Sequence, residues 1–484
     1  MRAPAFLLGL AALTLTADVE AQGLPLDTDA AREVGLSDAP RPLTLGRVLA
    51  AVQRHQPELR AALARARRAA ARELRAEGGF DPQLSVRGEV ITGGYYDLLR
   101  ADAELSQQTG VWGAEVYAGY RVGLGLDDEQ RFPTYYGDDT LDRGEVRVGV
   151  EIPLWRDGPI DSTRATLWAA EDRAVAADRA ADAVALDVSV AASRAYFRWV
   201  AAGHKLRIAE QQRALAAQRD EQLRQREIAG SASAFDVTEN LRSLIDRDDK
   251  MVQARQAFDI AAVALGFYLR DRGGEMQVPE PSRLPSLRPV TMGRLSPGAM
   301  AQAVACHPAL RELRAEQEAL RTELFLAENR VAPDIRATFE VSRDLGDESR
   351  DITLPGTVIQ AGLRFSMPLF LREGRGQASE ARAKLDELEA KLRRTEDRIR
   401  NALETASLSF EAASSRAELA ERLVATSEAL AAGERARFEA GASTLFLVNR
   451  REVAAADAAN RFIDALGTAN LAEFQFETLS SIDC

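Results

Sequence analysis

Residues 161–229 read DSTRATLWAAEDRAVAADRAADAVALDVSVAASRAYFRWVAAGHKLRIAEQQRALAAQRDEQLRQREIA. The stretch contains no proline and is rich in Ala and Arg, which both have high helix propensity. We therefore expect one uninterrupted helix, and a rise of about 1.5 Å per residue gives it a length of roughly 100 Å. A rod of this length exceeds the diameter of a globular domain, so the sequence predicts an elongated helical wall rather than a compact core.

One face of this helix carries small apolar residues at steps of three and four. They are Leu167, Ala170, Ala174, Ala177, Ala181, Val184, Val188, Ala191 and Ala195. A seam made mostly of alanine lets two helices approach closely, as in a coiled coil. A core stripe in an ordinary helix bundle is the alternative for a single helix of this kind.

The same plan occurs twice along the chain. Matching segments follow in the same order: Pro57-Glu58-Leu59-Arg60 and Pro308-Ala309-Leu310-Arg311, Phe80-Asp81-Pro82 and Val331-Ala332-Pro333, Pro153-Leu154-Trp155 and Pro368-Leu369-Phe370, Ala229-Gly230 and Ala440-Gly441. We interpret this as a tandem duplication, with a first repeat at 43–270 and a second at 298–479. The proline-rich stretch 271–297 is the predicted linker between them.

Each repeat is predicted to hold a helix, strands, a very long helix and a helix of intermediate length. In the first repeat the shorter helices, 57–78 and 234–270, together match the long one in length, so they can stack end to end along it. The second long helix is expected to run from near Gly376 to Gly441.

The segments between the helices alternate between apolar and polar residues. In the first repeat Leu84, Val86, Gly88 and Val90 share one face, as do Val146, Val148, Val150 and Ile152; in the second, Ile335, Ala337, Phe339 and Val341, and Ile359, Ala361, Leu363 and Phe365 do so. This period and length suit a tilted strand that crosses a bilayer, although a half-buried soluble sheet has the same period. Four strands are too few to close a membrane barrel, so the edges must pair with other chains, and three chains would supply an even number of strands.

The start of the chain and its composition limit the classes of function. Residues 1–21 are predicted to be a secretory signal peptide: an apolar run follows Arg2, and small residues precede the expected cleavage after Ala21. With a net charge of −12 at pH 7, nucleic acid is an unfavourable electrostatic partner. Two cysteines and three dispersed histidines in the whole chain argue against a disulfide framework, a metal site and most hydrolytic chemistry. We expect no enzyme activity and no cofactor.

The duplicated order of helix, strands, long helix and helix, with its proline boundaries and Ala-Gly turns, resembles the TolC family of outer-membrane efflux proteins from about Leu43 onward. The resemblance implies a mainly α-helical homotrimer in which a long α-helical barrel crosses the periplasm and continues as a 12-stranded membrane β-barrel. It further implies a location in the outer membrane of a Gram-negative bacterium. There the chain would be the exit duct of a tripartite efflux pump, with a periplasmic adaptor and an inner-membrane transporter of the RND or ABC type as partners.

The resemblance also assigns roles to residues. The turns after the two long helices would form the adaptor-facing tips: Ile228, Ala229, Gly230 and Ser231 in the first repeat, and Glu439, Ala440, Gly441 and Ala442 in the second. Pro82, Pro153, Pro333 and Pro368 mark the expected boundaries between strands and helices. Glycine at the end of a helix permits the left-handed conformation that reverses the chain, which is also its role in a plain helix stop.

The resemblance places the periplasmic aperture six residues beyond each tip glycine. The family often carries aspartate there, and this chain has Asp236 in the first repeat but Leu447 in the second, with Arg450 and Arg451 just beyond. The second repeat therefore departs from an acidic ring. A ring of Arg450 would favour anions, and a solvated helix face is the alternative. A further departure is an extra alternating segment at 112–122, which could pair with 98–106.

A second functional class remains open at this point. A soluble periplasmic adaptor or scaffold with a coiled coil and a small β-domain would share the helical pattern, although adaptors usually have one helical hairpin rather than two related ones. The transported solute is equally open, because drugs, metal ions and secreted polypeptides all use ducts of this kind.

Overall fold

The computed structural model describes residues 41–91, 98–125, 140–141, 143–271, 273–287, 297–346 and 356–480. All helices and strands named below lie within the unit Pro42–Cys484. The predicted signal peptide, residues 1–21, lies outside the described residues. No described helix combines the length and apolar character that crossing a bilayer requires.

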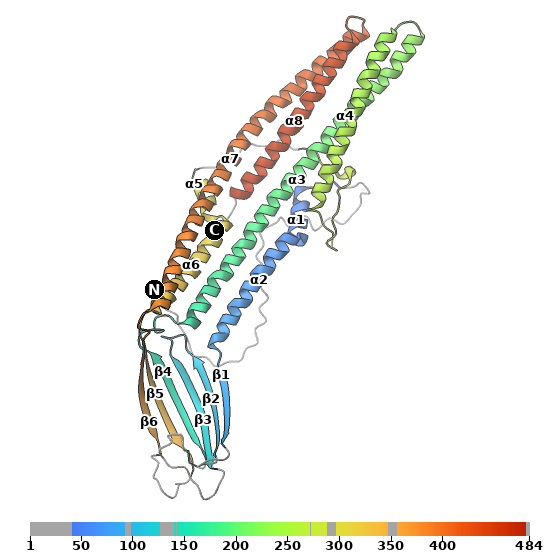
Figure 1. Ribbon diagram of the computed structural model, residues 1–484. Helices are drawn as coiled ribbons and strands as arrows, with labels where there is room; N and C mark the ends of the chain where they lie inside the picture. The colour runs from blue at the N-terminus through green and yellow to red at the C-terminus, as the bar shows by residue number, and fades with distance from the viewer. Residues whose placement is uncertain are drawn as a thin grey trace. The chain divides into compact units, whose positions relative to one another are not determined.

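The first repeat is built around one very long helix. Its helices are α1 (Leu45–His55), α2 (Pro57–Glu77), α3 (Ser162–Ile228) and α4 (Ala234–Gly266). Helix α3 is continuous over 67 residues and begins where the Asp161 side chain accepts hydrogen bonds from the backbone N–H groups of Thr163 and Arg164. Helices α1, α2 and α4 all pack along α3 (Figure 1). The prediction that shorter helices line one long partner is confirmed.

The second repeat follows the same plan. Its helices are α5 (Pro297–Cys306), α6 (Pro308–Asn329), α7 (Arg372–Glu439) and α8 (Leu445–Ser480). Helix α7 has 68 residues and begins at Arg372, four residues before the predicted start. Helices α6 and α8 line it as α2 and α4 line α3. Cys306, at the end of α5, is disulfide-bonded.

The two repeats pack side by side, with α3 of the first against α6 and α8 of the second. Helix α3 contacts α6 and α8 of the second repeat as well as α2 and α4 of the first, so α2, α3, α6 and α7 are successive neighbours in one row. Because α3 has neighbours on two sides, its buried residues are not confined to the predicted seam. Ala174, Ala181 and Val188 of that seam are buried, but so are Ala176 and Ala192, which lie outside it.

The largest apolar cluster joins the first repeat to the linker. Trp199 of α3 is fully buried and stacks on Phe258 of α4, with 6.2 Å between ring centroids. Leu284 of the linker packs into the same cluster. Gly203 of α3 leaves room for it, since a Cβ atom at this position would lie 2.6 Å from the Leu284 side chain. This part of the predicted linker therefore packs against the helices.

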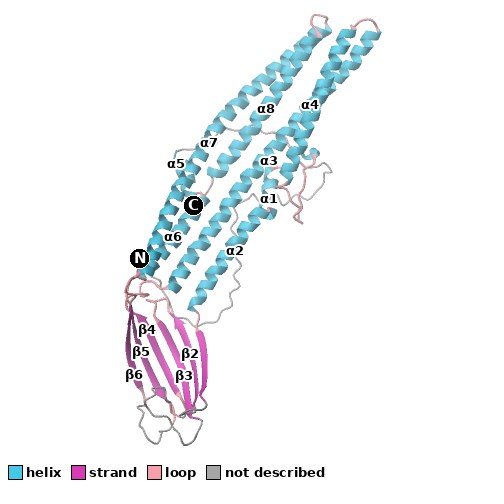
Figure 2. Cartoon of the chain, in the orientation of Figure 1, coloured by secondary structure: helices cyan, strands magenta, loops and turns pink. Residues whose placement is uncertain are grey.

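The strands form one antiparallel sheet in the order β1-β2-β3-β4-β5-β6 (Figure 2). Their bounds are β1 (Gln83–Ile91), β2 (Leu98–Gln108), β3 (Glu115–Gly125), β4 (Glu145–Pro153), β5 (Asp334–Asp344) and β6 (Val358–Ser366). The prediction of four strands per chain is wrong, because the extra segment and its suggested partner are both strands of this sheet. The predicted strand 112–122 also begins too early: Trp112 and Gly113 have positive φ angles of 52° and 64°, and this tight turn delays β3 until Glu115.

The register places most apolar residues of the sheet on one face, whereas Ile91, Leu98, Tyr117 and Val358 lie on the other. One row across four strands joins Leu84, Leu105, Ala118 and Val148 and continues to Val341 and Ile359 on β5 and β6. Charged residues fill the opposite face, where Arg87, Asp102, Arg121, Glu145 and Asp344 form a matching row. The predicted alternation is confirmed in every strand for which it was made.

Candidate functional site

The two tip turns, residues 228–231 and 439–442, have the same backbone geometry. Gly230 has φ 72° and Gly441 has φ 76°. In each turn the residue after the glycine donates its backbone N–H to a carbonyl five residues earlier, Ser231 to Arg226 and Ala442 to Arg437, both at 2.8 Å. This bond closes a helix with a left-handed glycine. A Cβ atom on either glycine would meet nothing within 4 Å, so the backbone angle, and not space, requires glycine there.

The surfaces of both tip turns are open to solvent. All eight predicted adaptor-facing residues are exposed, among them Ile228 at 81%. Phe235 and Phe446, at matching positions just beyond the turns, are exposed large aromatic side chains. Each repeat thus presents an exposed apolar side chain beside its reversal.

The residues predicted to form the aperture have unlike surroundings. Asp236 belongs to a capping box with Ser233: its backbone N–H donates to the Ser233 hydroxyl at 3.1 Å, and its carboxylate accepts from that hydroxyl at 2.7 Å. Leu447 takes the equivalent place in the second repeat, where its N–H faces the Thr444 hydroxyl at 3.4 Å. Arg450 and Arg451 are exposed on α8. A local capping role thus accounts for Asp236, and the aperture role of these residues stays a prediction.

A buried ion cluster joins three helices a short distance from the tips. Glu452 of α8 is 2% exposed and accepts hydrogen bonds from Arg219 of α3 at 2.5 Å and from Arg247 of α4 at 2.8 Å. Arg247 is 3% exposed and also donates to the Gln212 carbonyl at 2.9 Å. Arg219 also donates to the Asn449 amide oxygen at 3.0 Å. At about 1.5 Å per residue, Arg219 lies roughly 14 Å from the end of α3.

The charges of this cluster are neutralised by direct ion pairs between the side chains. Burial by itself would raise the pKa of the Glu452 carboxyl, but the hydrogen bonds and charges of Arg219 and Arg247 outweigh it, so its pKa lies below the ordinary value of 4.5. The carboxylate is therefore ionised at neutral pH and holds α8 of the second repeat against α3 and α4 of the first.

Sequence reasoning placed function on Arg450 and Arg451 and missed Glu452 beside them. The signal was present in the spacing. Val448, Glu452 and Ala455 recur at steps of four and three, and Val448 and Ala455 are buried. A carboxylate within an apolar stripe indicates a buried charge with a partner on another helix.

The polar face of the sheet carries a second set of ion pairs. Arg147 of β4 contacts Asp102 and Glu104 of β2 at 3.0 and 2.6 Å, and Arg121 pairs with Glu145. Near the helices, Arg336 of β5 contacts Glu151 at 3.0 Å and Asp157 at 2.9 Å. A face with this charge density suits water and not hydrocarbon.

Prolines occupy the ends of the strands that connect to helices. Pro82 and Pro333 directly precede β1 and β5, Pro153 ends β4, and Pro368 lies two residues after β6. Proline has no N–H to donate to a neighbouring strand, so it suits strand ends.

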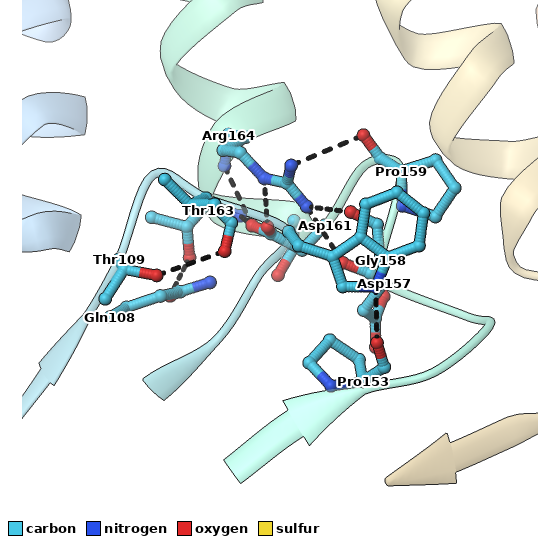
Figure 3. Close-up of polar contacts among 12 residues, drawn as sticks. Gln108, Thr109, Pro153, Asp157, Gly158, Pro159, Asp161, Thr163 and Arg164 are labelled. Atoms are coloured by element: carbon cyan, nitrogen blue, oxygen red, sulfur yellow. Dashed lines mark hydrogen bonds and ion pairs between the residues drawn. The ribbon is translucent and has the colours of Figure 1, made fainter. Parts of the chain in front are cut away.

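The turn between β2 and β3 packs against the segment that connects β4 to α3. The Trp112 indole N–H donates to the Pro153 carbonyl at 2.7 Å. The Thr163 hydroxyl donates to the Gln108 side chain at 2.7 Å (Figure 3). Buried Arg164 bonds Asp161 and donates to the carbonyls of Asp157 and Gly158 at 2.9 and 2.7 Å (Figure 3). Strands and helices are thereby fixed to each other at this end of the sheet.

Within the described ranges, the side chains form no group of three or more His, Cys, Asp or Glu that could hold a metal ion. His204, one of the three dispersed histidines, places Nε2 at 2.9 Å from the Pro285 carbonyl and helps to hold the linker.

Comparisons with known proteins agree with this architecture. Residues 299–480 match the family model described as outer membrane efflux protein. No curated protein matches the chain.

Solved structures share the fold along most of the chain at low identity. The outer membrane protein VceC from Vibrio cholerae is 15% identical with a TM-score of 0.61, over 90% of this chain and 95% of that one. The outer membrane channel MtrE of Neisseria gonorrhoeae, in its open state, is 13% identical with a TM-score of 0.62, over 90% and 88%. The outer membrane channel CmeC of Campylobacter jejuni is 11% identical with a TM-score of 0.61, over 96% and 93%. The resemblance of this chain to the TolC family of outer-membrane efflux proteins is therefore confirmed, by sequence in the second repeat and by fold along the described chain.

Proposed function

We propose that this protein is an outer-membrane channel that serves as the exit duct of a tripartite efflux pump, with solutes passing down a water-filled tube. The observation that carries the proposal is the two-faced sheet. Its apolar face is exposed in the single chain, with Val86 at 72% and Ile359 at 79%, and its opposite face is charged and internally paired. Strands of 9 to 11 residues match the length that crosses a bilayer at a tilt.

The sheet also argues against a soluble adaptor or scaffold. A soluble β-domain buries its apolar face against helices or a second sheet. Here the exposed large apolar side chains extend across the strands, including Leu84, Val148, Phe339, Leu363 and Phe365. Lipid chains are the surroundings in which such a face is stable.

The edge strands favour a homotrimer. Strands β1 and β6 form the two edges of the sheet, and backbone groups cannot stay unpaired in lipid. Because the sheet is antiparallel with an even number of strands, β6 of one copy can pair with β1 of the next in the same alternating sense. Three copies would close both the sheet and the row of long helices into one tube.

The tips are the proposed contact with a periplasmic adaptor, which joins the duct to an inner-membrane transporter. Exposed Ile228, Phe235 and Phe446 provide apolar anchors beside the reversals. Opening would require the tips to splay, and the ion cluster of Glu452, Arg219 and Arg247 opposes this by holding the two repeats together. Adaptor contacts would then stabilise the splayed arrangement.

Two experiments test the function. A detergent-extracted trimer from outer-membrane fractions, with migration that changes on heating, supports a channel, whereas recovery in the osmotic-shock supernatant contradicts it. Cysteine pairs across neighbouring tips near Gly230 and Gly441 should block export when oxidised, with each single cysteine as the control. Undiminished export by the oxidised pair would refute opening at the tips.

A further inference from the structure

We infer that the β2–β3 hairpin is part of the membrane wall, so that three copies close an 18-stranded barrel instead of the 12-stranded barrel that the family resemblance implies. The inference rests on the proposed function and concerns the width of its exit. The alternative is a hairpin that folds away from a narrower barrel.

The apolar face continues across the hairpin without a break. Leu105 of β2 lies between Leu84 of β1 and Ala118 of β3, and Ala118 pairs with Val148 of β4. Leu105, Val116 and Tyr120 of the hairpin are exposed on this face. A hairpin outside the barrel would have no reason to match the apolar register of both neighbours.

On the opposite face, side chains cross the hairpin strands at glycines. Arg147 of β4 passes over Gly119 of β3 to reach Asp102 and Glu104 of β2, and a Cβ atom on Gly119 would lie 2.9 Å from the Arg147 side chain. These ion pairs tie both hairpin strands to β4, which returns to α3.

Tyr117 of β3 makes the reverse crossing. Its ring lies over Gly149 of β4, where a Cβ atom would be 2.3 Å away, and its hydroxyl donates to Glu340 of β5 at 2.9 Å. Glycine inside a strand commonly marks such a close approach. The hairpin is thus linked to the second repeat as well as to the first.

The turn of the hairpin is anchored at the helix end. The Trp112 indole N–H donates to the Pro153 carbonyl, and a Cβ atom on Gly158 would lie 2.7 Å from the indole nitrogen. Gly113 lies so close that a Cβ atom there would be 2.4 Å from the Asp157 carbonyl. The contacts at the turn and along both strands therefore hold the hairpin in the sheet and oppose a position outside the barrel.

The widths of sheet and helices also agree. Four helices connect directly to the sheet, namely α2, α3, α6 and α7, and at a spacing of about 8–10 Å they occupy roughly 32–40 Å of a ring. At a strand spacing of about 4.8 Å and a tilt of about 40°, six strands occupy roughly 38 Å, whereas four would occupy about 25 Å. With the hairpin, the sheet is as wide as the row of four helices, because the hairpin adds two strands and no helix. The exit is then as wide as the helical tube and imposes no additional sieve.

The test measures contact with lipid at matched heights in the wall. A fluorophore is attached to single cysteines in the full-length trimer in vesicles that contain brominated phospholipid. The variants are Ala103→Cys and Ala118→Cys on the apolar face of the hairpin, Val148→Cys on the same face of β4, and Ser106→Cys on the polar face. Disulfide-bonded Cys306 does not take up the label.

We expect quenching at positions 103 and 118 within about twofold of that at 148, and little quenching at 106. Quenching at 148 without quenching at 103 and 118 would overturn the inference and leave the channel intact. Absence of quenching at 148 would overturn the proposed membrane channel itself. As a second measurement, electron microscopy of the trimer should give a backbone barrel diameter of about 36 Å, against about 24 Å for 12 strands.

Discussion

The ion cluster near the tips gives the sharpest prediction about stability. In Glu452→Gln the side chain keeps its shape but loses its charge, which leaves Arg219 and Arg247 without their buried counterion. Removing one partner of a buried ion pair costs about 3–5 kcal/mol. Arg219 keeps the Asn449 amide oxygen as an acceptor, and Arg247 keeps the Gln212 carbonyl. We therefore expect a loss of stability at the low end of this range, about 3 kcal/mol.

Hydrogen exchange measures this loss locally. A loss of about 3 kcal/mol corresponds to a factor of about 160 in the local opening equilibrium, at 1.36 kcal/mol for each factor of ten. Mass spectrometry of the intact detergent-solubilised protein should show protection falling by about that factor in peptides covering 445–460 and 212–224, with little change at the far end of α3. The double variant with Arg247→Met should recover part of the loss, because it removes a buried charge as well.

The control is Glu428→Gln. Glu428 lies on α7 at a similar distance from the tips but is exposed, so its loss should change protection by less than twofold. If Glu452→Gln behaves like this control, the cluster does not hold the repeats together and the reasoning above fails.

Three further outcomes are expected. The pKa of Glu452 is lowered in the folded protein, so its stabilising contribution is complete above pH 4.5 and is lost as pH falls through the folded pKa. After correction for intrinsic exchange, the hydrogen-exchange protection of residues 445–460 should therefore decrease below pH 4.5 in the parent protein. Glu452→Gln should show no such decrease. Gly230→Ala should destabilise the protein by about 1–2 kcal/mol because of its positive φ, whereas Gly433→Ala, inside a helix with open space around it, should stabilise it by about 0.5–1 kcal/mol; thermal melting that moves the same way in both would contradict the backbone argument. Gly203→Val should displace the linker leucine Leu284, and limited proteolysis should then cleave the linker faster than in the parent.

Local pattern alone determined the helices and most strands of this protein. Proline-free runs of strong helix formers specify α3 and α7, left-handed glycines specify where they reverse, and alternation specifies which strand residues share a face. Each of these features depends on neighbours within a few residues, which a sequence displays directly.

Tertiary structure alone decided the width of the sheet and the position of the ion cluster. Whether β2 and β3 extend the sheet depends on Arg147 and Tyr117 crossing strands at Gly119 and Gly149, contacts between positions up to 223 residues apart. Glu452 likewise finds its arginines only when α8 packs against the first repeat. A sequence shows the charge or the glycine, but the partner is chosen by packing, because such interactions form only between groups that the fold has already brought together.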